Sequence, residues 1–290
     1  MRVLVTGGAG FIGSHLVDRL INDGHEVVVL DNLSFGKKEW VNKKARLVLG
    51  DIRDPTTVAT ALQGCEAVFH LAALTDARSS DDDAIYQVNY LGSENVFNLA
   101  AAKKCKIIFT SSAAVYGEAF PCREAAECAP MNQYGKSKLK AEALLQRLDS
   151  DAFVARLFNC YGPRAKSVVN KFCDMIPNYK DIIIFGSGLQ TRDFVHVNDV
   201  VNALVLGMKN SGVYNVGTGV ETSVLHLVDT IHYITRAKPD TKFTAPVPGD
   251  IRRSRAETEK IKAIGWETRI SLEDGLRTLL DETGWKPLQI

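Results

Sequence analysis

A tyrosine and a lysine four residues apart are the part of this sequence best suited to proton transfer. Tyr134 and Lys138 lie in the run Asn-Gln-Tyr-Gly-Lys-Ser-Lys at positions 132–138, and residues four apart on a helix share one face. A free phenol has a pKa of about 10, so a tyrosine that acts as a base near neutral pH needs a nearby cation. Lys138 could supply that charge, or the two side chains could be a chance pair on a solvated face.

A second candidate follows an apolar segment that begins at Lys106 and ends in hydroxyl groups at Thr110, Ser111 and Ser112. Ligands of open parallel sheets bind at the carboxyl ends of strands. Ser112 could therefore hydrogen-bond the same substrate oxygen as Tyr134, or it could simply cap a turn.

The amino terminus has the order strand, glycine turn, helix. An apolar run at 2–6 leads into Gly-Gly-Ala-Gly-Phe-Ile-Gly at 7–13, and this spacing of glycines permits a tight turn and close approach of a pyrophosphate to the following helix. A second apolar run ends at Asp31, where a carboxylate can accept both ribose hydroxyls of an adenosine and repels a 2′-phosphate. The sequence therefore predicts a site for NAD rather than NADP.

Apolar segments of strand length alternate with helical periodicity over the first half of the chain, which predicts an α/β fold with a doubly wound parallel sheet. The pattern changes after Gly162 and Pro163, and we expect a smaller, C-terminal substrate-binding domain from there. The expected strands are 2–6, 26–30, 46–49, 66–70, 106–111, 152–157 and 182–185. The expected helices are 11–23, 55–62, 84–103, 133–149, 166–178, 257–264 and 271–283.

Charge and hydropathy exclude some classes of partner. Lysine and arginine number 35 against 34 aspartate and glutamate, so no basic surplus indicates a nucleic-acid partner. No stretch approaches the ~20 apolar residues of a membrane span, and the amino terminus enters the first expected strand without a charged leader and hydrophobic run. We expect a cytoplasmic enzyme with no membrane partner.

The cysteines and histidines show no metal-binding spacing. The six cysteines, at 65, 105, 122, 128, 160 and 173, have neither zinc-finger spacing nor a C-x-x-C pair and predict reduced thiols, although Cys122 and Cys128 could pair in a hyperthermophile. The six histidines are scattered, so no protein-bound metal is expected. His70 and His196 flank apolar runs and predict core or edge positions with their hydrogen bonds satisfied.

Nine motifs, taken together and in order, resemble the extended short-chain dehydrogenase/reductase family, and within it the nucleotide-sugar epimerases of the UDP-glucose (UDP-galactose) 4-epimerase type. They are Thr6–Gly13, Asp31–Asn32, Gly50–Asp54, His70–Ala73, Asn89 with Asn95, Ser111–Gly117, Tyr134–Lys138, Arg156–Arg164 and Arg192–Val200. The resemblance implies a Rossmann domain over 1–160 that binds NAD, a mainly sugar-nucleotide-binding part over 161–290, and a return of 192–219 to the first domain.

The resemblance also implies the residues that hold NAD, which would stay tightly bound and be regenerated in each cycle. These are Gly7, Gly10, Phe11, Ile12, Gly13, Asp31, Asn32, Asp51, Ile52, Leu71, Ala72, Ala73, Asn89, Tyr134 and Lys138.

The implied reaction takes place at C4 of a UDP-sugar. Tyr134 would take the proton of the sugar 4-hydroxyl, Ser112 would orient that oxygen, and Lys138 would assist both the phenolate and the nicotinamide ribose. Asn159 and Arg192 would bind the diphosphate, or they could form a turn and a structural ion pair.

One departure from the family pattern concerns the second phosphate-binding arginine. Many members have it just before a Pro-Gly-Asp turn, where this chain has Val247. Arg252 or Arg253 could substitute. In the same family the residue four beyond the aspartate of that turn lines the sugar 2-position. Here it is Ser254, which would leave space for an N-acetyl group or could face solvent.

Two alternative functions remain open, and the sequence also predicts a dimer. A 4,6-dehydratase, decarboxylase or reductase would share the fold, but the first two carry a carboxylate just after the strand-end hydroxyl, where this chain has Ala113 and Ala114. A non-catalytic NAD-binding protein is the other alternative. The apolar residues of 84–103 and 133–149, the segments through which the family pairs its subunits, predict a homodimer.

Overall fold

A parallel sheet of seven strands forms the larger part of the molecule, as described for residues 1–75, 81–247 and 249–285 in a computed structural model. The strand order is β11-β6-β5-β4-β1-β2-β3, so the chain winds outward in both directions from β1. This confirms the predicted doubly wound fold. The strands are β1 Arg2–Thr6, β2 Glu26–Asp31, β3 Arg46–Leu49, β4 Ala67–His70, β5 Lys106–Ser112, β6 Ala152–Leu157 and β11 Gly212–Val216.

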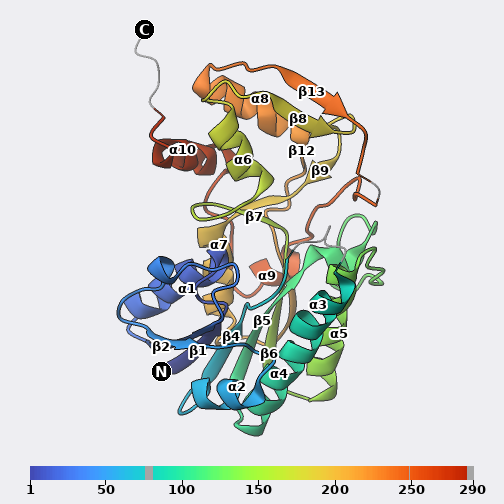
Figure 1. The fold of residues 1–290 in the computed structure, drawn as a ribbon. Coiled ribbons are helices and arrows are strands. Elements are labelled where there is room, and N and C mark those ends of the chain that lie inside the picture. The colour runs from blue at the N-terminus through green and yellow to red at the C-terminus, as the bar shows by residue number, and fades with distance from the viewer. Residues whose placement is uncertain (76–80, 248, 286–290) are drawn as a thin grey trace.

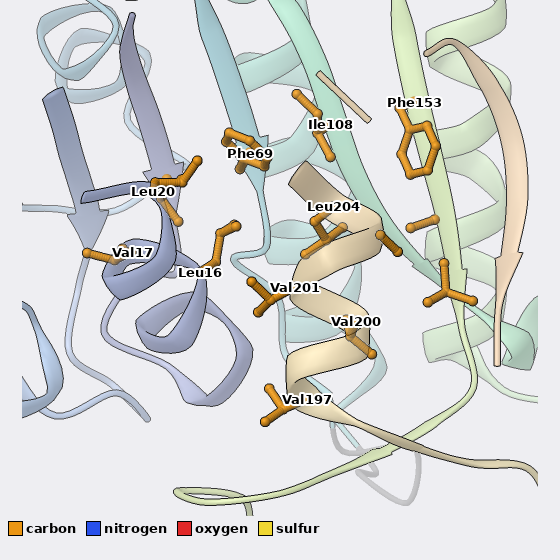
Figure 2. Close-up of a cluster of buried hydrophobic side chains, with 14 of the residues drawn as sticks. Leu16, Val17, Leu20, Phe69, Ile108, Phe153, Val197, Val200, Val201 and Leu204 are labelled. Atoms are coloured by element: carbon orange, nitrogen blue, oxygen red, sulfur yellow. The ribbon is translucent and has the colours of Figure 1, made fainter. Parts of the chain in front are cut away.

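Two helices cover one face of this sheet. Side chains of α1 (Phe11–Asn22) and α7 (Val197–Leu206) pack on the strands, and Figure 2 shows them gathered against strands that carry Phe69, Ile108 and Phe153. Successive side chains of a strand point to opposite faces, so Val3 and Val5 join this layer and Leu4 joins the other.

The opposite face is covered by α2 (Pro55–Ala61), α4 (Ser93–Ala102) and α5 (Gln133–Arg147). The segment predicted as one helix over 84–103 is a continuous run of three pieces, because a π-helical stretch separates two α-helices. The pieces are α3 Asp82–Tyr86, η2 Gln87–Gly92 and α4. In Figure 1, α3, α4 and α5 lie side by side.

Later parts of the chain return to the sheet. The strand β7 (Asn159–Tyr161) pairs with β10 (Phe194–His196), and β11 pairs with β6 at the edge of the sheet. After α9 (Glu259–Lys262), Trp266 is buried in the same layer as α1 and α7 and donates its indole N–H to the Asp199 carbonyl at 3.0 Å. The first layer is therefore built from both halves of the sequence.

A smaller part of the chain packs around its own core beyond the sheet (Figure 1). The helices of this part are α6 Val168–Met175, α8 Val224–Thr235 and α10 Leu272–Glu282, and its strand pairs are β8 Ile182–Phe185 with β13 Thr241–Thr244 and β9 Thr191–Arg192 with β12 Thr222–Ser223. The short helices η1 Lys38–Trp40 and η3 Ala113–Tyr116 lie in connections of the larger part.

The expected strands of the first half agree with the structure to within one residue at each end. The sequence analysis did not predict α7, α8, β10, β11 or β13, although the buried residues Leu227, Val228, Ile231 and Ile234 of α8 follow a helical period. Among the described helices, none is both long and apolar enough to cross a membrane.

Candidate active site

The carboxyl ends of neighbouring strands bring the candidate residues to one edge of the sheet. Thr6, Asp31, His70 and Ser112 are the last residues of β1, β2, β4 and β5, which are adjacent in the sheet. The segment β7, which follows β6, begins at the same edge and leads into the smaller part. A ligand at this edge would therefore meet both parts of the chain.

The glycine turn after β1 presents a bare helix terminus at this edge. A Cβ on Gly13 would lie 2.1 Å from the Gly7 carbonyl oxygen, so only glycine permits the turn to pack on α1. Gly10 precedes α1, and within the described residues no side chain caps the first turn of that helix. Unpaired N–H groups at a helix amino end attract phosphate oxygens.

The acidic residue predicted to bind a ribose is fixed by the backbone around it. Asp31 is 8% exposed, and its two carboxylate oxygens accept the N–H groups of Ala9 and Leu33 at 2.9 and 2.8 Å. These bonds hold the glycine turn against the end of β2. Each oxygen keeps a second lone pair for a ligand.

A small polar cluster continues from Asp31. The Asn32 amide donates to Asp51 at 2.9 Å, and the Arg53 guanidinium donates twice to the same carboxylate. Hydrogen bonding by Arg53 lowers the pKa of Asp51 to about 2, so the carboxylate is charged at neutral pH. The adjacent Ile52 side chain is 5% exposed and belongs to the core.

Leu71, Ala72 and Ala73 line the exit of β4, where the N–H groups of Leu71 and Ala72 both point to Thr6 Oγ1 at 3.3 Å. Asn89, in the π-helical stretch, is fully buried. Its amide oxygen accepts from the Leu74 N–H at 2.7 Å and its amide nitrogen donates to the Leu74 carbonyl at 2.9 Å. This geometry fixes the wall formed by 71–74, rather than directing Asn89 toward a ligand.

Helix α5 begins beside the end of β5 for two local reasons. The Asn132 side chain caps the helix by accepting from the Gly135 N–H at 2.8 Å. A Cβ on Gly135 would lie 2.6 Å from the Ala114 carbonyl oxygen, so the glycine between Tyr134 and Lys138 allows α5 to approach η3 closely.

This approach joins three side chains of α5 to the last three residues of β5. Tyr134 shares a hydrogen bond with the Ser112 hydroxyl, and the Lys138 ammonium donates to the Thr110 carbonyl at 2.9 Å. One turn further, the Glu142 carboxylate accepts from the Ser111 hydroxyl. The structure therefore brings Tyr134, Lys138 and Ser112 together as expected, although Ser112 also caps η3 by accepting from the Ala114 N–H at 3.2 Å.

Burial controls the ionisation of Tyr134 and Lys138 in this structure. Burial lowers the pKa of Lys138 to about 7, against the opposing pull of the Glu142 carboxylate. Burial also raises the pKa of Tyr134, against the hydrogen bond with Ser112. In the protein alone, the Lys138 ammonium lies 5.9 Å from the centre of the Tyr134 ring and is bound to Thr110, and the effect of burial on the Tyr134 pKa is the larger one.

Arg192 takes part in an ion pair, the alternative that its sequence position left open. Its guanidinium lies 2.6 Å from an Asp250 carboxylate oxygen and donates to the Ile251 carbonyl at 2.7 Å. Asn159 is exposed on β7, and its N–H donates to the Asp193 carbonyl at 2.9 Å. Arg192 is thus bound to residues 250 and 251, and Asn159 pairs with the strand that follows Arg192. Pro248 lies outside the described residues.

The two arginines considered as substitutes for the one absent at Val247 differ in their surroundings. Arg253 donates twice to Glu221, at 2.7 and 2.8 Å, and its guanidinium lies 3.7 Å from the centre of the Phe120 ring. Arg252 is exposed, and within the described residues its side chain has no hydrogen bond or ion pair. Ser254 is 6% exposed, so the alternative that it faces solvent is wrong.

The cysteines are reduced and His70 has its hydrogen bonds satisfied, as predicted, whereas His196 has only one of its two ring nitrogens hydrogen-bonded among the described residues. All six cysteines are free, Cys122 and Cys128 included. His70 is fully buried, with its two ring nitrogens 2.7 Å from Thr6 Oγ1 and 2.8 Å from Ser93 Oγ. His196 Nδ1 accepts from the Asn198 N–H, but the buried His196 Nε2 finds no partner among the described residues.

Sequence reasoning missed the buried charges behind this site. Glu142 and Arg156 form a salt bridge with side chains 3% and 7% exposed. Two signals could have identified the pair: Glu142 follows Lys138 by one helical turn, and Arg156 interrupts an apolar strand. A charge at a position of core periodicity requires a partner.

Comparisons with known proteins agree with this geometry. The family model described as NAD dependent epimerase/dehydratase family matches residues 3–217. The UDP-glucose 4-epimerase of Mycolicibacterium smegmatis is 37% identical over 301 residues, covering 95% of this chain and 96% of that relative. The UDP-glucuronic acid decarboxylase 1 of Arabidopsis thaliana is 30% identical over 307 residues, covering 97% and 69%.

Among solved structures, the UDP-glucose 4-epimerase of Thermotoga maritima with UDP-glucose superimposes with a TM-score of 0.94 and 35% identity. The match covers 98% of this chain and 99% of that one. The similarity therefore extends over the sheet and the smaller part alike.

The raised pKa of Tyr134 can be measured directly. In protein stripped of bound nucleotide, we expect the phenol of Tyr134 to ionise above pH 10, because burial disfavours the phenolate. The measurement is the difference in 295 nm absorbance between wild type and Tyr134→Phe during an alkaline titration, with far-UV circular dichroism to confirm folding. Tyr233→Phe, which removes a ring that is 76% exposed, gives the reference curve. A Tyr134 midpoint below pH 9 would contradict this prediction.

Proposed function

The chain belongs to the NAD dependent epimerase/dehydratase family, and we propose that it interconverts UDP-glucose and UDP-galactose. The proposed reaction oxidises C4 of the sugar to a ketone and reduces it again on the opposite face. The observation that carries the proposal is the group of Tyr134, Ser112 and Lys138 at the carboxyl end of β5, with alanines in the two positions after Ser112.

The residues at the sheet edge fit NAD. The uncapped amino end of α1 suits a pyrophosphate, and the Gly13 position leaves no room for a side chain at the turn. Asp31 offers its remaining lone pairs to ribose hydroxyls, while Asn32, Asp51 and the wall 71–73 enclose the space beside them. When bound, NAD supplies the group that accepts the C4 hydride and returns it, so it is regenerated and can remain bound.

Within this site the protein moves one proton. The Tyr134 phenolate oxygen accepts the proton of the sugar 4-hydroxyl during oxidation and gives it back to the C4 oxygen during reduction. Ser112, which lies beside Tyr134, turns its single O–H toward the same sugar oxygen. Lys138 provides positive charge beside the phenolate and a donor for the nicotinamide ribose. Because burial raises the pKa of Tyr134, the phenolate requires cationic charge beyond that of Lys138.

We assign the remaining residues by their position. Residues 1–160 with the returning segment 192–219 would bind NAD, and most of 161–290 would bind the sugar nucleotide. Asn159, Arg192 and the exposed Arg252 would contact the diphosphate, with Arg192 held in place by Asp250. Asn89 would act on the cofactor through Leu74, because its side chain binds both the N–H and the carbonyl of that residue.

The chain is also similar to a UDP-glucuronic acid decarboxylase, so epimerisation has to be distinguished from decarboxylation. Removing a group at C5 or C6 after C4 oxidation requires a second acid or base near the strand-end hydroxyl. Here Ala113 and Ala114 follow Ser112 as the first residues of η3, and neither can transfer a proton. This favours epimerisation over elimination or decarboxylation.

A substrate panel tests the proposed function. We expect purified protein, without added NAD, to convert UDP-glucose and UDP-galactose into each other and to release no CO₂ from UDP-glucuronic acid. Tyr134→Phe should reduce turnover by about 10²- to 10⁴-fold with the fold intact, because it removes the proton-transfer group and keeps the ring. Chromatography separates the epimers. Release of CO₂ from UDP-glucuronic acid, or near-normal turnover by Tyr134→Phe, would refute the assignment.

The carboxylate of Asp31 should determine the choice of nicotinamide cofactor. We expect wild type to bind NAD more tightly than NADP, since a 2′-phosphate would lie against a buried carboxylate. Asp31→Ala should weaken the binding of NAD and reduce the difference in affinity between NAD and NADP. Calorimetric titration of the apoprotein measures both affinities. Asp174→Ala, a control at a side chain that is 60% exposed, should change neither affinity. Equal affinity of wild type for the two cofactors would exclude the proposed role.

Ser254 should set the tolerance for a group at the sugar 2-position. We expect N-acetylated UDP-hexoses to be accepted beside UDP-galactose, because the buried Ser254 side chain is small, and Ser254→Tyr to lower kcat/KM selectively for the acetylated substrate. Arg252→Gln is the comparison, since loss of a diphosphate contact should raise KM for both substrates alike. An unchanged ratio of kcat/KM in Ser254→Tyr would mean that this side chain does not touch the sugar.

We further propose a homodimer formed through α3, α4 and α5. Val88, Leu91, Leu99, Leu139 and Leu148 remain only partly buried on neighbouring helices of one face. Covering this face would remove further apolar surface from water. Analytical ultracentrifugation at micromolar concentration should show a dimer, and Leu139→Glu should shift it toward monomer. A monomeric wild type at that concentration would rule the assembly out.

A further inference from the structure

A buried ion pair lies directly behind the candidate catalytic residues. Arg156 on β6 donates to Glu142 on α5 through both Nε, at 3.1 Å, and Nη2, at 2.6 Å. Both side chains are almost completely buried. A buried ion pair is weak evidence for stability, because desolvation of two charges offsets much of their attraction and apolar residues of similar volume often serve as well. Its presence here calls for another explanation.

The geometry places the carboxylate of this pair in line with the reactive residues. Tyr134, Lys138 and Glu142 succeed one another at intervals of four residues, so they lie along one face of α5. That face meets Ser112, Thr110 and Ser111, three consecutive residues at the end of β5. Glu142 therefore contacts the strand one residue before Ser112 and lies one turn from Lys138.

We infer that Glu142 and Arg156 are positioning residues for the proton-transfer group. Glu142 keeps the Lys138 ammonium charged and fixes Ser111, and Arg156 holds the Glu142 carboxylate in place. The inference rests on the proposed function, because it assigns the pair to the same site. Both side chains are almost completely buried, so we assign their effect to contacts with Lys138 and Ser111.

The charges around the pair support this assignment. Five titratable side chains surround Glu142 and Lys138. They are Tyr134 on α5, Tyr116 in η3, His70 on β4, Cys128 in the loop before α5, and Arg156 on β6. Burial raises the pKa of both tyrosines and of Cys128, and lowers that of His70 to about 3. Of these groups only Arg156 is charged at neutral pH, so Glu142 is the negative charge that offsets the desolvation of Lys138.

Arg156 is itself held by contacts beyond Glu142. It donates to the Tyr116 hydroxyl at 3.0 Å and to the Glu124 carbonyl at 3.2 Å. The Tyr116 hydroxyl in turn donates to Asn215 on β11 at 2.7 Å. These bonds leave the guanidinium little freedom to follow the carboxylate, so the position of Glu142 is set by the sheet rather than by α5 alone.

The test uses two substitutions of the same ion pair that should act in opposite directions. Glu142→Gln keeps the shape and the contact with Ser111 but removes the negative charge, so Lys138 should lose its proton about one pH unit or more below its wild-type midpoint. Arg156→Met removes the competing cation and leaves the carboxylate to Lys138, so the midpoint should rise. A merely structural role predicts loss of stability in both variants without opposite shifts.

The titration is followed by NMR of protein labelled with ¹³C at lysine Cε, in the absence of substrate, with the Lys138 signal assigned by its loss in Lys138→Met. Circular dichroism confirms that each variant is folded. If one single variant does not fold, the double variant Glu142→Gln with Arg156→Met is compared with the single variant that does, and its midpoint should lie below that of Arg156→Met or above that of Glu142→Gln. Glu273→Gln, at an exposed ion pair with Arg277, is the matched control and should leave the midpoint unchanged.

The outcomes separate this inference from the proposed function. A lowered midpoint in Glu142→Gln together with a raised midpoint in Arg156→Met supports it. The alkaline limb of kcat/KM should then move to lower pH in Glu142→Gln. A midpoint that is unmoved or raised in Glu142→Gln, or unmoved or lowered in Arg156→Met, overturns the inference even if wild type is an active epimerase. Opposite shifts in a protein that turns over no nucleotide sugar would overturn the proposed function and leave the inference standing.

Discussion

The contact between helix α5 and the last three residues of β5 is the constraint on which the candidate site depends. Side chains at successive turns of the helix bind Ser112, Thr110 and Ser111. The helix can come this close because Gly135 has no side chain where α5 faces the Ala114 carbonyl. The same contact fixes both the positions of Tyr134 and Lys138 and the environment that controls their charge.

Burial makes that environment demanding. Desolvation disfavours the charged forms of both residues, raising the pKa of Tyr134 and lowering that of Lys138 to about 7. A tyrosine and a lysine at helical spacing are therefore not by themselves a proton-transfer device. Their charges depend on neighbours, and the carboxylate closest along the helix, Glu142, belongs to a buried ion pair anchored in the sheet.

The way the chain returns to the sheet explains how a two-part molecule can hold one ligand site. The strand β10 pairs with β7, and the Asp193 carboxylate just before it accepts N–H groups from Thr218, Gly219 and Ala256. The segment that carries Arg192 is thus tied both to β7 and to the stretch after Ser254. Residues proposed to bind the diphosphate and the sugar are therefore fixed relative to the sheet edge that carries Ser112.

Local patterns along the chain were enough to predict the fold class and the residues that line the sheet edge. Period-two and period-3.6 apolar patterns, the glycine turn and Asp31 depend on local spacing, and the predicted strands of the first half match the structure within one residue. The pair Tyr134 and Lys138 was visible for the same reason, since residues four apart on a helix share a face. The charge states of these groups, and the contacts that hold them in place, depend on the tertiary structure. Three interactions join residues that are far apart in the sequence: the ion pair of Glu142 with Arg156, the hydrogen bonds of Asn89 to Leu74, and the ion pair of Arg192 with Asp250. Desolvation and ion pairing act through space, so no periodicity along the chain records them.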